Sequence, residues 1–270
     1  MRRLMTIYLI GLISFGVPAF ALDAMGPPAA GLRQNQFEVG ADYSYSTMDL
    51  RLVGGKWVEW LNGSFYDAGR AFSLTLENVK TNKMYIGFGY GITDNWDVSL
   101  RLGGANARFG DSIWGEGEKF DNPTDFAFGL STRATFYQED NLKLGGLLQF
   151  SWTELDGKLK SAYWPVSDSV DIELREIQIA IGPTYQPTDT LSIYGGPFFH
   201  RVSGELKDRF SEMYQEGLLT SRYSWDIKER SVFGGYIGLQ IDASRNASFN
   251  IEYQYTGAAD ALGLGFIWRF

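Results

Sequence analysis

The sequence predicts an all-β protein that forms one transmembrane, antiparallel, up-and-down β-barrel. Aromatic residues make up 16% of the chain, and glycine accounts for 32 of its 270 residues. This composition suits strands that face lipid on one side and a crowded lumen on the other. Apolar and polar residues also alternate along many segments, as in strands with two unlike faces. After residue 21 no run reaches about 18 consecutive apolar residues, so no membrane-spanning helix is expected.

The first 21 residues have the features of an export signal. Arg2 and Arg3 precede a mostly apolar run from Leu4 to Phe15, and Ala19-Phe20-Ala21 forms an A-x-A cleavage site. The apolar run is short for a spanning helix, which needs about 20 residues. We therefore expect residues 1–21 to be a signal peptide that is removed on export.

Residues 22–35 follow as a lead without periodicity. The lead is rich in proline, glycine and alanine and contains Gly26-Pro27-Pro28. Such a composition favours irregular structure, and we expect a periplasmic tail. The barrel is expected to occupy residues 36–270.

From Gln36 onwards, a period-two alternation predicts about ten strands. In the first of them, Phe37 and Val39 alternate with Glu38 and Gly40. The predicted strands cover residues 36–46, 83–92, 96–102, 126–136, 142–152, 177–185, 191–199, 233–241, 249–255 and 262–270. An even number is required if both chain ends lie on the same side of the membrane.

The connections between these strands alternate in length. Tight turns rich in Asp, Asn, Thr, Ser and Pro end at Asn95, Asn141, Thr190 and Asn246. The longer connections are Arg51–Ser73, Ala107–Thr124, Glu154–Asp171 and Gly204–Glu229, with a short fifth at Ala258–Asp260. Short turns on the periplasmic side and long extracellular loops are typical of membrane barrels. The strand count becomes twelve if Arg51–Ser73 or Gly204–Glu229 contains another hairpin.

A soluble β-sandwich or a lipocalin-like barrel would show the same alternation. The distribution of aromatic residues favours the membrane barrel, because aromatic side chains flank an aliphatic band at both ends of the strands. Near the short turns they are Tyr90, Trp96, Phe136, Tyr185 and Trp268, and near the long connections Tyr45, Phe126, Trp152, Phe199 and Tyr255.

The last predicted strand carries a family resemblance. It places Leu262, Leu264, Phe266, Trp268 and Phe270 on one face and ends the chain on an aromatic residue. Such a strand resembles the assembly signal of Gram-negative bacterial outer-membrane β-barrel proteins. The stretch Tyr90–Leu100 also resembles hairpins of that class. The resemblance implies a location in the outer membrane, contact with its lipid and lipopolysaccharide, and recognition of the last strand by the barrel-assembly machinery.

The same class includes ten-stranded proteases, the omptins, as well as lipases and deacylases. The single histidine of this chain, His200, follows Phe198 and Phe199, so the Asp-x-His pattern of the omptins is absent. It precedes Arg201, Val202 and Ser203, so the His-x-Ser pattern of the lipases is absent as well. No catalytic set carries over, and His200 alone is a candidate general base.

The second candidate site consists of charged residues at the alternate strand positions that are predicted to point into the lumen. They are Glu38, Asp42, Asp97, Arg101, Arg133, Lys143, Glu176, Glu252 and Arg269. Both signs are present, and buried charge is tolerated when it is paired or hydrated. The residues therefore predict either a salt-bridged plug or a narrow polar conduit.

Charge and composition exclude several functions. The formal net charge of −8 disfavours nucleic-acid binding, and the absence of cysteine excludes disulfides and thiolate chemistry. No ordered set of ligands predicts a metal or cofactor. The remaining hypotheses are a non-enzymatic structural or narrow porin-like barrel, a surface-recognition barrel, and an outer-membrane hydrolase of omptin-like or lipase type. Recognition would use the aromatic residues of the long connections: Trp57, Trp60, Tyr66, Trp114, Tyr163, Trp164, Tyr214 and Trp225.

Overall fold

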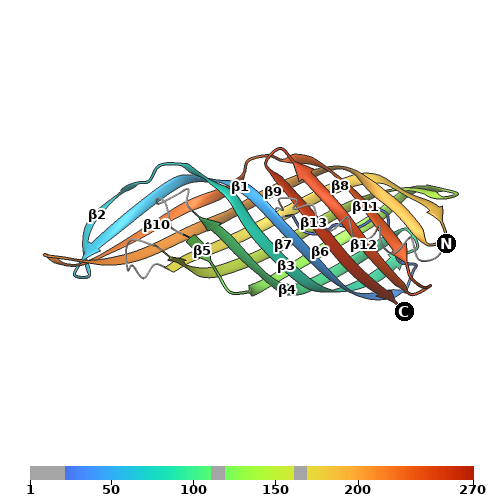
Figure 1. The fold of residues 1–270 in the computed structure, drawn as a ribbon, viewed down its shortest axis with the longest axis horizontal. Coiled ribbons are helices and arrows are strands. Elements are labelled where there is room, and N and C mark those ends of the chain that lie inside the picture. Colours follow the sequence, from blue (N-terminus) through green and yellow to red (C-terminus); the bar gives the residue numbers. More distant parts are fainter. Residues whose placement is uncertain (1–21, 111–118, 161–168) are drawn as a thin grey trace, which may run out of the picture.

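The structure is a computed structural model that describes residues 22–110, 119–160 and 169–270. Over these residues the chain forms one elongated barrel of antiparallel strands (Figure 1). The expected signal peptide lies outside the described residues, and its cleavage stays a prediction. In the described part, no helix is long and apolar enough to span a membrane.

Ten of the described strands close the ring that crosses the membrane, as the alternation predicts. In ring order they are β1 (Phe37–Leu61), β3 (Leu74–Thr93), β4 (Trp96–Gly110), β6 (Asp125–Glu139), β7 (Leu142–Lys160), β8 (Ser169–Thr188), β9 (Leu191–Tyr214), β11 (Phe233–Asp242), β12 (Ala247–Thr256) and β13 (Ala259–Arg269). The last strand closes the ring against the first, from Glu38 opposite Arg269 to Met48 opposite Ala259. Because the two strands pair along this seam, the sheet leaves no open edge to lipid.

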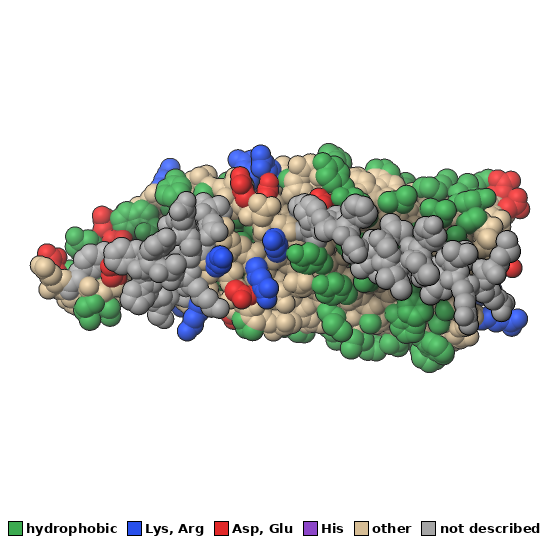
Figure 2. All heavy atoms as spheres, viewed as in Figure 1, with side chains coloured by type: hydrophobic (Ala, Val, Ile, Leu, Met, Phe, Trp, Pro, Cys, Tyr) green, Lys and Arg blue, Asp and Glu red, His purple; other side chains and the backbone are tan. Residues whose placement is uncertain are grey.

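One face of the ring is a continuous apolar band. The exposed side chains of the band include Val39, Ile86, Phe88, Leu100, Leu130, Leu148, Ile179, Ile193, Ile237, Leu239, Ile251 and Leu264. Figure 2 shows hydrophobic side chains gathered over the half of the molecule that holds β11, β12 and β13. On the closing strand, Leu262, Leu264, Trp268 and Phe270 are exposed and Phe266 is half-buried. This band faces lipid.

The long connections differ from the expected loops, because most of their described residues are strands. β1 continues to Leu61 and pairs with β2 (Ser64–Arg70), while β9 continues to Tyr214 and pairs with β10 (Gly217–Glu229). The hairpins foreseen in Arg51–Ser73 and Gly204–Glu229 therefore exist, but they extend the barrel outward instead of adding strands to the membrane ring. Together with β5 (Lys119–Asp121), they build what we call the extension.

The extension has its own ring and its own core. Eight described strands, β1, β3, β4, β5, β7, β8, β9 and β10, pair around it. Eight strands enclose a space that side chains just fill. Here they are apolar and buried: Met48, Leu50, Leu52, Leu76, Val79, Phe109, Phe120, Leu155, Val170, Ile172, Leu174, Val202, Leu206, Trp225 and Ile227. The interior of the extension is thus apolar, whereas the interior of the membrane ring combines charged side chains with apolar ones such as Leu147 and Phe198.

Candidate functional site: a filled lumen

Most of the segment 22–34 lies inside the barrel, with Arg33 and Gln34 exposed at its mouth, so the expectation of a periplasmic tail is wrong for most of this segment. Leu22 and Asp23 are fully buried, and Ala29 is 3% exposed. The segment, which we call the plug, runs from deep in the lumen to the periplasmic mouth, where Asn35 N donates to Gly91 O just before β1 begins. An irregular backbone is tolerated at membrane depth when protein surrounds it and supplies hydrogen-bond partners.

Carboxylates on the barrel wall accept hydrogen bonds from the plug backbone. Glu252 accepts from Met25 N at 2.6 Å and from Gly26 N at 2.7 Å. Asp97 accepts from Gly31 N at 2.7 Å and from Leu32 N at 3.3 Å. Hydrogen bonds to charged acceptors contribute more than neutral ones. The wall therefore binds the plug at two depths through groups that do not depend on the plug's side chains.

Glycines give the plug its space. A Cβ at Gly145 would lie 2.4 Å from Ala29 Cα, and one at Gly91 would lie 1.9 Å from Arg33 O. Both distances are far below van der Waals contact, so only glycine permits this approach of two backbones. Glycines of the wall thus lie at the positions where the plug backbone comes closest to it.

An ionic chain crosses the lumen and includes one plug residue. The Asp23 carboxylate lies 2.8 Å from Lys83 Nζ and 3.1 Å from Arg101 Nη2. On one side Lys83 also pairs with Glu176, which faces His200 Nε2 at 3.3 Å.

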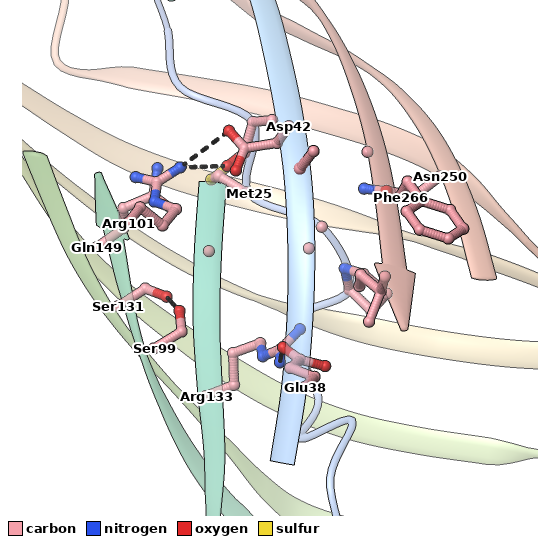
Figure 3. Close-up of a pocket in the computed structure, with 18 of the residues that line it drawn as sticks. Met25, Glu38, Asp42, Ser99, Arg101, Ser131, Arg133, Gln149, Asn250 and Phe266 are labelled. Carbon is pink, nitrogen blue, oxygen red and sulfur yellow. Dashed lines mark hydrogen bonds and ion pairs between the residues drawn. The ribbon is translucent and has the colours of Figure 1, made fainter. Parts of the chain in front are cut away.

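On the other side of Asp23, Arg101 lies 3.5 Å from Asp42 on β1 (Figure 3). The chain thus runs from β9 to β1, with Asp23 in the middle. Charges this deeply buried are stable in a membrane only when they are paired.

A second cluster lies closer to the periplasm. Arg133 Nε donates to Asp97 at 2.8 Å, and Arg133 Nη2 donates to Glu38 at 3.0 Å. Glu38 also lies 3.9 Å from Arg269. Figure 3 shows the Arg133 side chain next to Glu38 on β1. The cluster ties Asp97, which holds the plug, to three further strands, β6, β1 and β13.

Deep in the lumen, the free space left beside the plug is small. The cavity in Figure 3 has a volume of about 80 Å³ and is lined by plug residues, Asp42, Ser99, Ser131 and Gln149. Since a water molecule occupies about 30 Å³ of liquid, this cavity holds a few waters and is too small for a solute conduit. Ser99 Oγ and Ser131 Oγ, 2.7 Å apart, continue its polar lining.

The structure places all nine sequence-predicted charges on the inner side of the wall. Glu38, Asp42, Asp97, Arg101, Arg133, Glu176 and Glu252 lie within the lumen, and Lys143 and Arg269 lie at its periplasmic mouth. The sequence-based set omits Asp23 and Lys83. Lys83 lies two residues before Tyr85 on the same strand, so the alternation places both side chains inward and could have identified Lys83. Asp23 precedes the alternating segments, so no sequence pattern indicates its position.

His200 is fully buried on β9 and faces Glu176. Its Nδ1 has no hydrogen-bond partner among the described residues. A general base must come within hydrogen-bonding distance of its substrate, and a substrate has no approach to this imidazole. The geometry therefore does not favour the hydrolase hypothesis.

No protein-family model and no curated protein matches the chain. Several solved structures are similar in fold. The translocator domain of autotransporter NalP from Neisseria meningitidis has 11% identity and a TM-score of 0.44 over 98% of this chain and 95% of that chain. The outer-membrane protein OprG from Pseudomonas aeruginosa has 10% identity and a TM-score of 0.41, over 89% and 98%. The outer-membrane protease OmpT from Escherichia coli has 12% identity and a TM-score of 0.40, over 92% and 97%.

Likenesses at this level carry no argument about activity. The class of the protein follows from its own features, which are the closed strand ring, the lipid-facing band and the charged interior. Closed barrels with such a band are the β-structures that span a bilayer. The protein is an integral transmembrane β-barrel.

Proposed function

We propose that the protein is a non-enzymatic, structural outer-membrane barrel whose lumen is sealed by its own N-terminal segment. The observation that carries this proposal is the position of the plug: its backbone is bound by Glu252 and Asp97, and Asp23 completes the ionic chain. A porin-like conduit through the same space needs the plug to leave.

Planar-bilayer conductance tests the proposal. Chains refolded from residue 22 and from residue 33 differ only in the plug, and both should shift on gels when heated, as folded barrels do. We expect the full chain to give no current above background and the truncated chain to give discrete conductance steps. A full chain that conducts as strongly as the truncated one would exclude a sealed lumen. A truncated chain as silent as the full one would show that the plug is not the seal.

Surface recognition is a second candidate, supported by the tip of the extension. The β1–β2 and β9–β10 hairpins meet there, where Asn62 N donates to Leu218 O at 2.9 Å. Apolar side chains at this tip are exposed in water, with Phe65 at 68% and Met213 at 75%. Exposed apolar side chains on a soluble surface often mark contact sites.

Aggregation of cells that display the protein tests this candidate. Cells with the native chain should sediment together faster than cells with the double variant Phe65→Ser/Met213→Ser. The variant Lys207→Ser, on the side of the extension, serves as the matched control and should behave like the native chain. Equal sedimentation of all three, at equal amounts of heat-modifiable protein, would exclude adhesion through the tip.

A further inference from the structure

The periplasmic mouth of the barrel contains a basic cavity. It has a volume of about 640 Å³ and is lined by Arg33, Lys143, Arg245 and Arg269, with Asp94 as the one acidic residue of its lining. The four cations come from four parts of the chain: the plug, β7, the β11–β12 turn and β13. Residues distant in sequence thus bring like charges to one place.

These cations lack the counter-charges that the deeper clusters have. Within the described residues, the side chains of Arg33, Lys143 and Arg245 make no ion pair. Arg269 lies 3.9 Å from Glu38, whose other oxygen is held by Arg133 at 3.0 Å. The Nε of Arg269 is buried and has no hydrogen-bond acceptor in the described part of the chain.

The acidic groups nearby are already engaged or lie elsewhere. Asp94 Oδ1 accepts from Gln34 N at 3.0 Å. Asp140 and Asp242 line a neighbouring cavity of about 310 Å³, which Lys143 and Arg269 also line. Asp242 Oδ1 accepts from Ser248 Oγ at 2.6 Å, and neither carboxylate forms an ion pair with these cations within the described residues. Like charges at close range repel unless an anion lies between them. The cavity therefore has an excess of positive charge, which attracts an anion.

We propose that the periplasmic mouth binds a phosphate group between Arg33, Lys143 and Arg269. Guanidinium groups match the oxygens of a phosphate with two parallel hydrogen bonds, and an ammonium adds a point charge. Gln36 and Asn246 also line the cavity. Gln36 Oε1 accepts from Arg33 N, which leaves the amide nitrogen of Gln36 to donate to the ligand. The phosphate group belongs to a free solute of the periplasm or to a lipid headgroup of the inner leaflet.

Binding at this site is coupled to the plug. Arg33 is part of the plug, so the complete set of cations exists only when the plug is seated. A ligand that binds one of two states better shifts the population toward that state. Phosphate binding therefore stabilises the seated plug, and loss of the plug weakens phosphate binding.

Calorimetric titration of the refolded full chain tests the site. One arm adds inorganic pyrophosphate to protein in a neutral detergent, and the other adds short-chain phosphatidylglycerol. Saturable binding in the first arm identifies a free solute, and binding in the second alone identifies a headgroup. Substitution Lys143→Gln or Arg33→Gln should weaken binding about tenfold, which corresponds to the loss of a charge-assisted hydrogen bond.

Two controls make the outcome decisive. Lys207→Gln removes an exposed cation of the extension and should leave the affinity unchanged. Arg33→Gln lies outside the strands, so its barrel should fold and stay silent in bilayers while its phosphate affinity falls. No saturable binding in either arm, or equal affinity in Lys143→Gln, Arg33→Gln and the native chain, would overturn the proposal. Neither result would bear on whether the plug seals the lumen.

Discussion

At the scale of single residues, Asp23 has the most demanding position. Its side chain is fully buried between Lys83 and Arg101. Removing its charge leaves each of these cations with one carboxylate partner instead of two. Breaking a buried ion pair by removing one partner costs about 3–5 kcal/mol. We expect Asp23→Asn to lower the free energy of unfolding by an amount of that order. Urea titration in detergent, followed by the loss of heat-modifiability, measures it.

An exposed ion pair provides the comparison for this substitution. Glu205 lies 3.0 Å from Lys207 on the outer face of the extension, and its hydrogen bond raises the pKa of Lys207. Because water screens such pairs, Glu205→Gln should change the unfolding midpoint very little. If Asp23→Asn shifts the midpoint no more than Glu205→Gln does, the ionic chain contributes nothing to stability.

The pairing of individual charges shows where sequence reasoning ends. The position of Glu176 and Arg101 in the sequence indicates that they point inward, because apolar and polar residues alternate regularly along the strands that carry them. The alternation does not say which charges meet across the lumen, since that depends on strand tilt and ring size. Nor does it reach Asp23, because the plug has no periodicity. The pairing of Lys83 with Asp23 therefore cannot be predicted from the sequence.

At the scale of elements, the contact between the plug and the wall makes a testable prediction. A methyl group at Gly91 would overlap Arg33 O at 1.9 Å, whereas one at Gly87 on the same strand meets its nearest atom at 3.7 Å. We therefore expect Gly91→Ala to unseat the plug and Gly87→Ala to leave it in place. Bilayer conductance and protease cleavage within residues 22–34 both report on this.

Gly91→Ala and Gly87→Ala add the same methyl group to β3 within the membrane, and only the first brings it against the plug. Gly91→Ala should give conductance steps and a shortened chain after proteolysis, with the barrel still heat-modifiable. A silent, protease-resistant Gly91→Ala variant would show that the plug adapts to the extra methyl group. Gly145→Ala, whose methyl group would meet Ala29 Cα at 2.4 Å, repeats the test on β7.

The closing strand gives a prediction about assembly. Phe270 N donates to Phe37 O at 2.9 Å, at the periplasmic end of the seam between β13 and β1. Removal of Phe270 takes away this bond and the terminal aromatic residue, and should lower the fraction of heat-modifiable protein in cells. Phe65→Ser at the tip should not. Equal fractions in both would show that assembly does not depend on the terminal residue.

At the scale of the whole molecule, the ring of ten strands could be predicted, whereas the extension could not. Within the membrane, outward apolar and inward polar residues alternate from Phe37 to Tyr45. Beyond it, Leu50 and Leu52 are buried and the charged Arg51 is exposed. The same period continues with the opposite assignment of faces. A sequence pattern that is interpreted with lipid outside takes these residues for loops, although their hydrogen bonds continue the strands.

This inversion of faces leads to a prediction about unfolding. The extension is held by an apolar core in water, and the membrane ring by paired charges inside and lipid outside. Urea should therefore unfold the extension before the ring, because urea solvates apolar side chains exposed to water. Two transitions should appear, the first reported by quenching of Trp225 and the second by loss of heat-modifiability. A single transition for both signals would show that the two parts unfold as one.

The inverted interior has a further consequence for how this protein tolerates change. Above the membrane, a leucine that points inward adds to an apolar core. Within the membrane ring, a leucine that replaces a paired charge leaves the partner of that charge unpaired. The same substitution on the same strand thus has opposite effects on the two sides of the membrane boundary. Along each long strand, substitutions in the extension must suit water outside, and those in the ring must suit lipid outside. The extension and the ring can therefore diverge independently, although they share their backbone.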